Sequence, residues 1–188
     1  MKNTLTLLLI LFLCASCTAQ GVFSNQTNNT LEKVVKDYPS QFKNIKGELL
    51  SSRPGSSEYK STITIPGSVS TTIIQSAAAH KQSVCWQSVI YSGKEFDQAK
   101  SRFEELFNQI KNTIIKAEGE KAVIVNGMYI DPTADKTFTT IQFDLLPASG
   151  LMQKVNIDLL LQNTGNQWKI VLSVYDNDRK EAEAMVVK

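Results

Sequence analysis

Two neighbouring segments near the C-terminal end of the chain place apolar side chains at every second position. In residues 155–162 and again in residues 168–174, apolar side chains alternate with mainly polar ones, which is the period of a β-strand with one buried face. The connection at 163–166 contains Asn, Thr and Gly, as tight turns do. The pair predicts an antiparallel hairpin, and the rest of the chain must then cover one apolar sheet face.

Other stretches show weaker forms of the same pattern. Residues 69–76 are rich in β-branched side chains but are less clearly placed as a strand. Pro and Gly residues separate most of these stretches, as expected of turns between strands. We therefore expect about six or seven strands in all. The other predicted strands lie within residues 48–52, 59–65, 84–91, 122–130 and 137–146.

The clearest helix is predicted from residue 94 to about residue 117. Ser92 and Glu95 have the spacing of a capping box, in which each side chain satisfies a free backbone N–H. Gly119 stands where helices commonly end. One apolar stripe follows the helical period and should pack on a sheet. The stripe consists of Phe96, Ala99, Phe103, Leu106, Phe107, Ile110 and Ile114.

A shorter helix is predicted to begin near Thr30. Asn29 is a suitable N-cap, and the Glu32 side chain, three residues later, can accept a hydrogen bond from the backbone N–H of Asn29. Pro39 should break or restart this helix because its ring cannot continue the helical hydrogen bonding. The apolar face extends to about Gly47.

Together these elements predict an α+β fold with a single domain at residues 30–178. We expect a two-layer arrangement, in which a mainly antiparallel sheet is covered on one face by the N-terminal helix and the long central helix. Residues 179–188 are charged, then weakly apolar, and we expect this tail to fray. A domain of this length can bury a core without disulfides or metals.

The N-terminal residues have the pattern of a secretory signal. Lys2 precedes an apolar run at residues 5–13, and small residues follow it up to Ala19. The run is shorter than the roughly 20 apolar residues of a membrane-spanning helix. We therefore expect a signal peptide at residues 1–20, a polar spacer at 21–29 and an exported protein with no transmembrane span.

Two processing routes remain open for this signal. A general signal peptidase would cut after Ala19 and release the protein to the periplasm or the medium. Residues 14–17, Cys-Ala-Ser-Cys, resemble a bacterial lipobox, although a Leu is usual where Cys14 stands. That resemblance implies cleavage before Cys17 and lipidation of its sulfur, which would tether the protein to a membrane.

The charge and the cysteines narrow the possible functions. Without Lys2, the mature chain has 19 basic and 18 acidic residues, a balance that gives no electrostatic case for binding nucleic acid or an anionic membrane. Cys14 and Cys17 are removed or blocked, so no internal disulfide is possible. Cys85 is then a lone thiol, and we interpret it as a small buried side chain on a strand.

Few residues offer metal or nucleophilic chemistry. His80 is the single histidine, so we expect no metal site and no cofactor. On an extended segment His80 and Cys85 point to opposite faces, which disfavours a Cys–His nucleophile. Residues 176–178, Asp-Asn-Asp, begin like a calcium loop, but Glu181 and Val187 replace its required Gly and Glu. The sequence has no Gly-x-Ser-x-Gly, P-loop or dinucleotide-binding motif.

Four carboxylates are left as candidates for acid–base chemistry. Asp131 and Asp135 flank a turn that contains proline, and Asp144 and Asp158 project from the polar faces of strands. No spacing requires any two of them to meet, so we name no catalytic residue. Trp86 and Trp168 could line a pocket, but their alternating strand positions favour the core.

Three functional hypotheses follow. The first is a non-enzymatic exported protein that binds an unknown protein or a small apolar ligand, or serves the cell envelope, through its sheet or loops. The second is a periplasmic chaperone or carrier of lipids or other apolar ligands, which would need Phe103, Phe107 and Trp168 exposed beneath the long helix. The third is a hydrolase of unrecognised type, in which a pocket would bring together His80 or two of the four carboxylates.

Overall fold

One antiparallel sheet dominates the protein. The structure is a computed structural model, and it describes residues 19–78, 81–116, 119 and 121–176. Within these residues nine strands pair in the order β1-β2-β3-β4-β9-β8-β7-β6-β5. The strands are β1 (Lys46–Arg53), β2 (Ser56–Ser61), β3 (Ser70–Ala78), β4 (Lys81–Gly93), β5 (Ile114–Ile115), β6 (Val123–Gly127), β7 (Phe138–Leu146), β8 (Val155–Asn163) and β9 (Trp168–Asp176).

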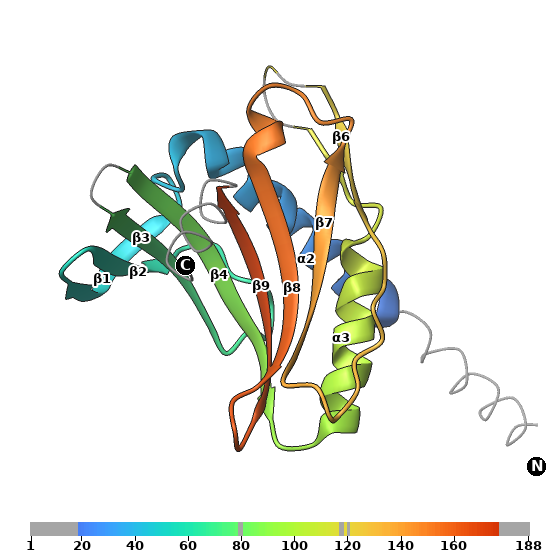
Figure 1. Ribbon diagram of the computed structural model, residues 1–188. Helices are drawn as coiled ribbons and strands as arrows, with labels where there is room; N and C mark the ends of the chain where they lie inside the picture. The colour runs from blue at the N-terminus through green and yellow to red at the C-terminus, as the bar shows by residue number, and fades with distance from the viewer. Residues whose placement is uncertain (1–18, 79–80, 117–118, 120, 177–188) are drawn as a thin grey trace, which may run out of the picture.

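The sheet consists of two meanders that meet in its centre. Strands β1 to β4 form the first meander and β5 to β9 the second, and each strand pairs with its neighbour in the chain within its meander. The pairing of β4 with β9, in which Trp86 lies opposite Val174, joins the two. Figure 1 shows the resulting twisted sheet, with β1 at one edge and the short β5–β6 pair at the other.

The expectation of six or seven strands is wrong. Strand β5 has only two residues, and the sequence placed them inside the central helix. Strand β3 pairs with strands on both of its sides although Ser, Thr and Ala supply most of its side chains. Neither strand has a readable alternation of apolar and polar residues, because one is too short and the other has few apolar residues.

Two helices lie on the same face of the sheet. Helix α2 (Ala19–Asp37) packs against α3 (Phe96–Ile110), and α3 in turn contacts β4, β8 and β9. Figure 1 shows both helices behind the sheet. The predicted antiparallel α+β fold with two helices is therefore confirmed. The buried helix residues are Leu31, Val34 and Val35 of α2, and Ala99, Phe103, Leu106, Phe107 and Ile110 of α3.

Helix α3 is shorter than predicted at both ends. It begins at Phe96, and Glu95 occupies the N-cap position without a capping hydrogen bond from its side chain. The capping box is wrong because the Ser92 hydroxyl donates to Gln167 Oε1 at 2.9 Å instead. The helix ends at Ile110, and Asn112 takes a left-handed conformation with φ 68° that starts a new chain direction.

Helix α2 begins earlier than predicted and includes the residues expected as a polar spacer. Its polar side chains are used inside the fold: Thr27 is buried, and its hydroxyl donates to Gln109 Oε1 of α3 at 2.9 Å. Pro39 ends the helix as predicted, and the chain restarts as the 3₁₀ helix η2 (Tyr38–Ser40). No helix in the described part of the chain is long and apolar enough to cross a membrane.

The core between the helices and the sheet is filled by large side chains. Trp86 is fully buried, and its Nε1 donates to Ser61 Oγ at 3.1 Å. Trp168 packs against Phe96 with ring centroids 4.8 Å apart. Both tryptophans therefore belong to the core, as their strand positions indicated.

Candidate functional site

A pocket of about 260 Å³ opens at one end of the first meander, beside the turn after η2. It lies between the turn after η2 and the ends of β2, β3, β4 and β9. We call it the η2 pocket. Its lining residues are Gln41, Arg53, Gly55, Ser56, Ser57, Gln75, Ser76, Ala77, Ser83, Val84 and Asp176.

The turn on one side of the η2 pocket holds an uncommon backbone conformation. Gln41 and Phe42 follow η2 with φ of 55° and 56°, in the left-handed region that side chains other than glycine rarely adopt. Phe42 is fully buried and packs edge to face with Tyr38, at a centroid distance of 6.1 Å. Packing of this ring holds the turn, and Gln41 is left exposed at the pocket. Backbone strain of this kind is typical of functional sites.

The floor of the pocket is a row of side chains across three strands. Ser57 lies opposite Gln75, and Gln75 lies opposite Val84. Gln75 follows the fully buried Ile73 by two residues, so both side chains point to the helix side of the sheet. The floor is therefore polar at its centre and apolar toward β4.

The β1–β2 hairpin forms the outer wall. Pro54 and Gly55 make its turn between the paired residues Arg53 and Ser56, and Gly55 has φ 79°. The Ala77 N–H donates to the Gly55 carbonyl at 2.8 Å, which fixes the hairpin tip against β3. A side chain at Gly55 would be strained in this conformation, so glycine meets a backbone requirement here.

The lining groups suit a ligand that both donates and accepts hydrogen bonds. The amides of Gln41 and Gln75 and the hydroxyl of Ser57 offer donors and acceptors at once. Arg53 and Asp176 are the charged residues of the lining, one of each sign. A serine nucleophile would also need an adjacent base such as histidine, and His80 lies outside the described residues.

The structure places some of the sequence candidates and leaves others outside its described range. Cys17, His80 and residues 177–178 fall outside that range, so the expectations for them stay predictions. Cys85 is buried on β4 as expected, and its thiol donates to the Trp86 carbonyl at 3.5 Å. In the described part of the chain, no group of three or more His, Cys, Asp or Glu side chains could hold a metal ion.

Two of the four carboxylates, Asp131 and Asp135, lie in the loop between β6 and β7. The Lys100 ammonium forms an ion pair with Asp131 at 2.8 Å. Tyr129 Oη donates to Asp131 Oδ1 at 3.4 Å, and burial, helped by nearby carboxylates, raises the pKa of Tyr129 to about 12. Asp135 is exposed, and a hydrogen bond from Thr133 lowers the pKa of its carboxyl group. Asp131 and Asp135 therefore have surface partners and face no pocket residue.

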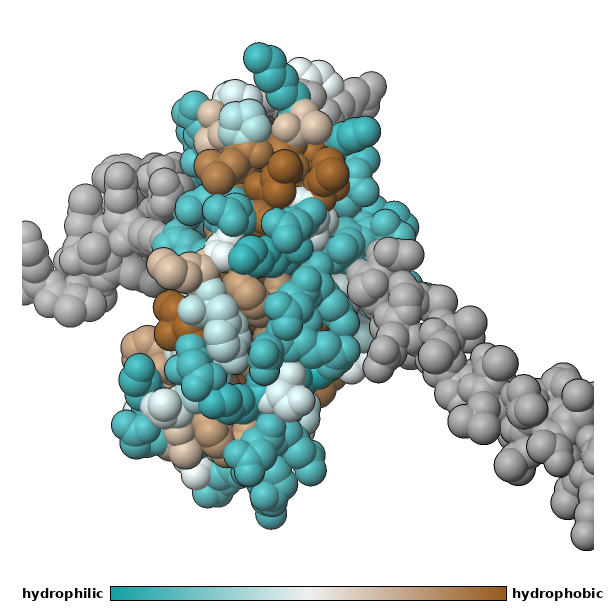
Figure 2. All heavy atoms as spheres, turned by 90° about the vertical axis from the view of Figure 1, so that its right-hand side faces the viewer, coloured by the Kyte–Doolittle hydropathy of each residue, from teal (hydrophilic) through white to brown (hydrophobic). Residues whose placement is uncertain are grey.

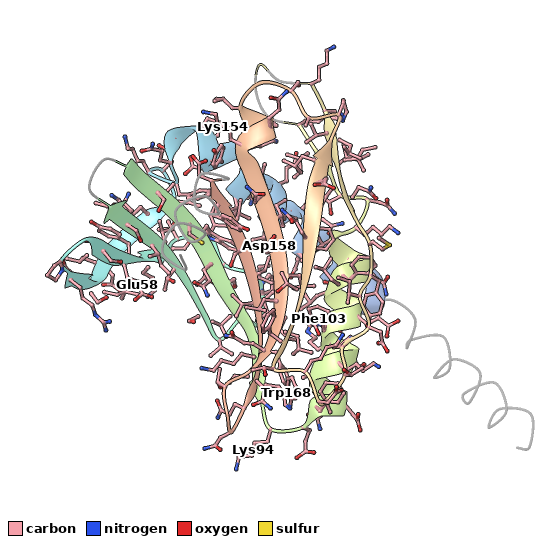
Figure 3. All side chains as sticks on the ribbon, in the orientation of Figure 1. Glu58, Lys94, Phe103, Lys154, Asp158 and Trp168 are labelled. Carbon is pink, nitrogen blue, oxygen red and sulfur yellow. The ribbon has the colours of Figure 1, made fainter. Side chains whose placement is uncertain are left out.

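The other two carboxylates share the face of the sheet that points away from the helices. Asp158 of β8 lies opposite Gln142 of β7, and Gln142 precedes Asp144 by two residues on β7. The Tyr175 hydroxyl donates to Asp158 Oδ2 at 2.6 Å. Figure 3 shows Asp158 on the middle of β8, away from α3. Asp144 and Asp158 are diagonal neighbours, and neither lines the η2 pocket.

An apolar ladder crosses the β5 edge of the sheet. Ile114 lies opposite Ile124, and Ile124 lies opposite Leu146. All three are about half exposed, at 56, 45 and 47 %. Figure 2 shows apolar side chains gathered in the upper part of this side of the molecule. Grouped apolar exposure of this kind is typical of contact surfaces.

Sequence reasoning missed the η2 pocket because no local motif marks it. The register of β2 and β3 places Ser57 beside Gln75, and Gln41 joins them from the turn after η2. The single local hint was the Pro39 restart, which predicted a break but not its left-handed exit. Neither a protein-family model, nor a curated protein, nor a solved structure matches this chain.

Proposed function

We propose that this is an exported, non-enzymatic binding protein that takes a small polar ligand in the η2 pocket. The observation that carries the proposal is the convergence of Gln41, Ser57 and Gln75 on one pocket beside a strained turn. A pocket with a few convergent polar groups is the default binding site of a structure. The ligand class that fits is a sugar, polyol or amide whose groups donate and accept hydrogen bonds.

The size of the pocket limits the ligand. Its volume of about 260 Å³ lies just below the roughly 300–1,000 Å³ of most ligand sites. A single sugar unit or a molecule of similar size is therefore the expected occupant. Val84 and Ala77 supply the apolar surface on which such a ring can rest.

The packing beneath α3 favours this proposal over a carrier of apolar ligands. The carrier hypothesis needs Phe103, Phe107 and Trp168 exposed, and they are 0, 5 and 7 % exposed. Phe107 also stacks on Phe143 at a centroid distance of 5.8 Å. These side chains occupy the space that an apolar ligand would need.

A ligand panel tests the proposal directly. We expect one class among hexoses, N-acetylhexosamines, polyols and amino-acid amides to raise the unfolding midpoint of the protein in a thermal-shift assay. A ligand at 100 times its Kd stabilises the folded state by about 2.7 kcal/mol. Calorimetric titration of the best compound then gives its Kd.

Two matched glutamine variants locate the site. Gln75→Ala removes a pocket hydrogen bond and should raise the Kd by roughly three- to ten-fold. Gln87→Ala is the control, because Gln87 is also half-buried but points to the opposite face of the sheet. Equal effects of the two variants, or no binding by any panel member, would count against the proposal. Turnover of a panel compound would favour the hydrolase hypothesis instead.

Export and tethering form a separate part of the proposal, supported by the signal pattern of residues 1–20. The intact mass of the protein recovered from its native host distinguishes the two routes. A mature chain that starts at Gln20 or Gly21 shows release and rules out lipidation. A chain that starts at a diacylated Cys17 shows a membrane tether and rules out release.

A further inference from the structure

Strand β1 is an open edge of the sheet. Within the described residues it pairs with β2 alone, at the end of the nine-stranded order that lies farthest from β5 (Figure 1). The β5 edge is better protected, because β5 has only two residues and α2 packs beside it. β1 has eight residues, so its free backbone groups can add a further strand.

Two residues of β1 direct their backbone groups to the open edge. Arg53 and Ser56 are paired across the two-residue turn of the hairpin, and such a pair exchanges hydrogen bonds within the hairpin. The backbone N–H and C=O of the preceding residue, Ser52, therefore point away from β2. Leu49 has the same orientation, because its partner on β2, Tyr59, lies two residues beyond the partner of Ser52.

A bulge between these two residues restricts what can pair with them. Leu49 and Ser51 lie opposite consecutive residues of β2, so Leu50 is an extra residue in β1. A regular strand placed along this edge would be out of step with the bulge. An antiparallel second copy of β1 carries the same extra residue. With Leu49 opposite Ser52 of that copy, the two bulges lie opposite each other and the pairing stays in step.

The charges of β1 favour the same register. In this register Glu48 lies opposite Arg53 of the second copy, and the two-fold symmetry creates this pair twice. Glu48 and Arg53 share one face of the sheet, because Glu48 forms an ion pair with Lys60 at 3.5 Å and Arg53 lies opposite Ser56. Lys60 and Ser56 are four residues apart on β2 and so point the same way. A shift of the register by two residues would place Lys46 opposite Arg53, and like charges in that position are unfavourable.

We propose that the protein forms a two-fold symmetric dimer in which the β1 strands of two copies pair antiparallel in this register. The pairing covers part of Leu49 and Leu50, which are 55 and 51 % exposed in the single chain. It joins two nine-stranded sheets into one and is closed, because each copy uses the same edge. One short strand per copy makes a small interface, so the dimer should dissociate on dilution.

The contact involves a residue of the η2 pocket. Arg53 lines that pocket, and in the dimer its guanidinium group faces Glu48 of the second copy. Dimer formation and ligand binding would therefore share one side chain. The dimer does not depend on the proposed ligand, however, since it is argued from the sheet edge alone. Its test is made without ligand, so the failure of one proposal does not imply the failure of the other.

Two charge variants test the register. Sedimentation velocity over a roughly hundred-fold range of protein concentration gives the dimer Kd of the wild type. Glu48→Arg and Arg53→Glu each place like charges opposite each other at both ends of the pairing. Each should raise the Kd by about ten-fold or more. An equimolar mixture of the two variants restores both opposite-charge pairs, so we expect a mixed dimer with a Kd near that of the wild type. Recovery in the mixture would show that both variants are folded.

A third variant controls for net charge. Glu104 is exposed on α3, and Glu104→Arg changes the charge by the same amount as Glu48→Arg. It should leave the dimer Kd unchanged. A wild type that stays monomeric at every concentration would overturn the proposal and leave the β1 edge to a segment of another protein. A dimer that survives both charge variants, or a mixture that does not recover, would also overturn it, because the contact would then lie elsewhere.

Discussion

Gly127 offers the sharpest test of how the core is packed. It lies opposite Phe143 at the end of β6. A Cβ atom added at Gly127 would stand 2.6 Å from Phe143 Cδ1 and 3.0 Å from Cε1. Phe143 is 1 % exposed and stacks on Phe107, so its ring cannot swing into solvent. Gly127→Ala should therefore destabilise the protein through this one contact.

The expected cost follows from the overlap. Carbon atoms pack best at about 3.5–4.0 Å, so the Phe143 ring must retreat by roughly 1 Å. Overpacking of a core by a small group typically costs about 1–3 kcal/mol. For a domain of this size, a loss of about 2 kcal/mol lowers the melting temperature by roughly 4–8 °C. The backbone of Gly127 adds no strain of its own, because its φ is outside the left-handed region.

Urea unfolding of four proteins measures this contact as a coupling energy. The proteins are the wild type, Gly127→Ala, Phe143→Leu and the double variant, followed by the fluorescence of the buried tryptophans. Removal of the ring frees space, so Gly127→Ala should be nearly neutral in the Phe143→Leu background. We expect a favourable coupling of about 1–2 kcal/mol. The same cost of Gly127→Ala in both backgrounds would refute the reasoning.

Three further outcomes are expected. Gly55→Ala should cost about 1–2 kcal/mol in urea unfolding, because Gly55 has φ 79° and its Cβ would lie 3.2 Å from the Ala77 carbonyl oxygen. Burial raises the pKa of Tyr129 to about 12, whereas the unfolded chain ionises near pH 10. The stability from this protonated phenol is complete below pH 10 and is lost as pH rises to about 12. Because water screens this partly exposed group, we expect a loss of only about 1 kcal/mol. Tyr129→Phe should abolish that loss in urea midpoints measured across this pH range. Lys100→Ala should cost less than about 1 kcal/mol, since its ion pair with Asp131 is 34 and 60 % exposed; a larger loss in thermal unfolding would show a structural role.

Periodic features were predictable from the sequence. The alternation in β4 placed Val84, Trp86 and Ile90 on one face, and all three are buried in the core. The apolar stripe of α3 is buried from Ala99 to Ile110. Both patterns repeat over several residues, so each remains recognisable even if one residue departs from it. The antiparallel pairing followed from the short links between strands.

Features that depend on one residue or on the register were not predictable. Ile114 has the spacing of the apolar stripe of α3. The left-handed backbone of Asn112 turns the chain away from the helix axis, however, and Ile114 is instead an exposed residue of the edge strand β5. Ser92 has the correct spacing for a capping box, but its hydroxyl donates a hydrogen bond to Gln167, which is distant in the sequence. The η2 pocket was missed for the same reason, since the pairing of β2 with β3 joins Ser57 to Gln75 and a distant turn adds Gln41. Long-range contacts override local signals at such positions.

The pairing of β4 with β9 also fixes the order in which the fold can be completed. β9 is a central strand of the sheet and the last strand in the described chain. In a chain that emerges with its N-terminus first, β4 keeps an unpaired edge until β9 follows. An unpaired strand edge invites pairing with other chains, and non-local pairing slows folding. The first meander is therefore vulnerable to aggregation during synthesis, and the shortest chain able to close the sheet must reach Asp176.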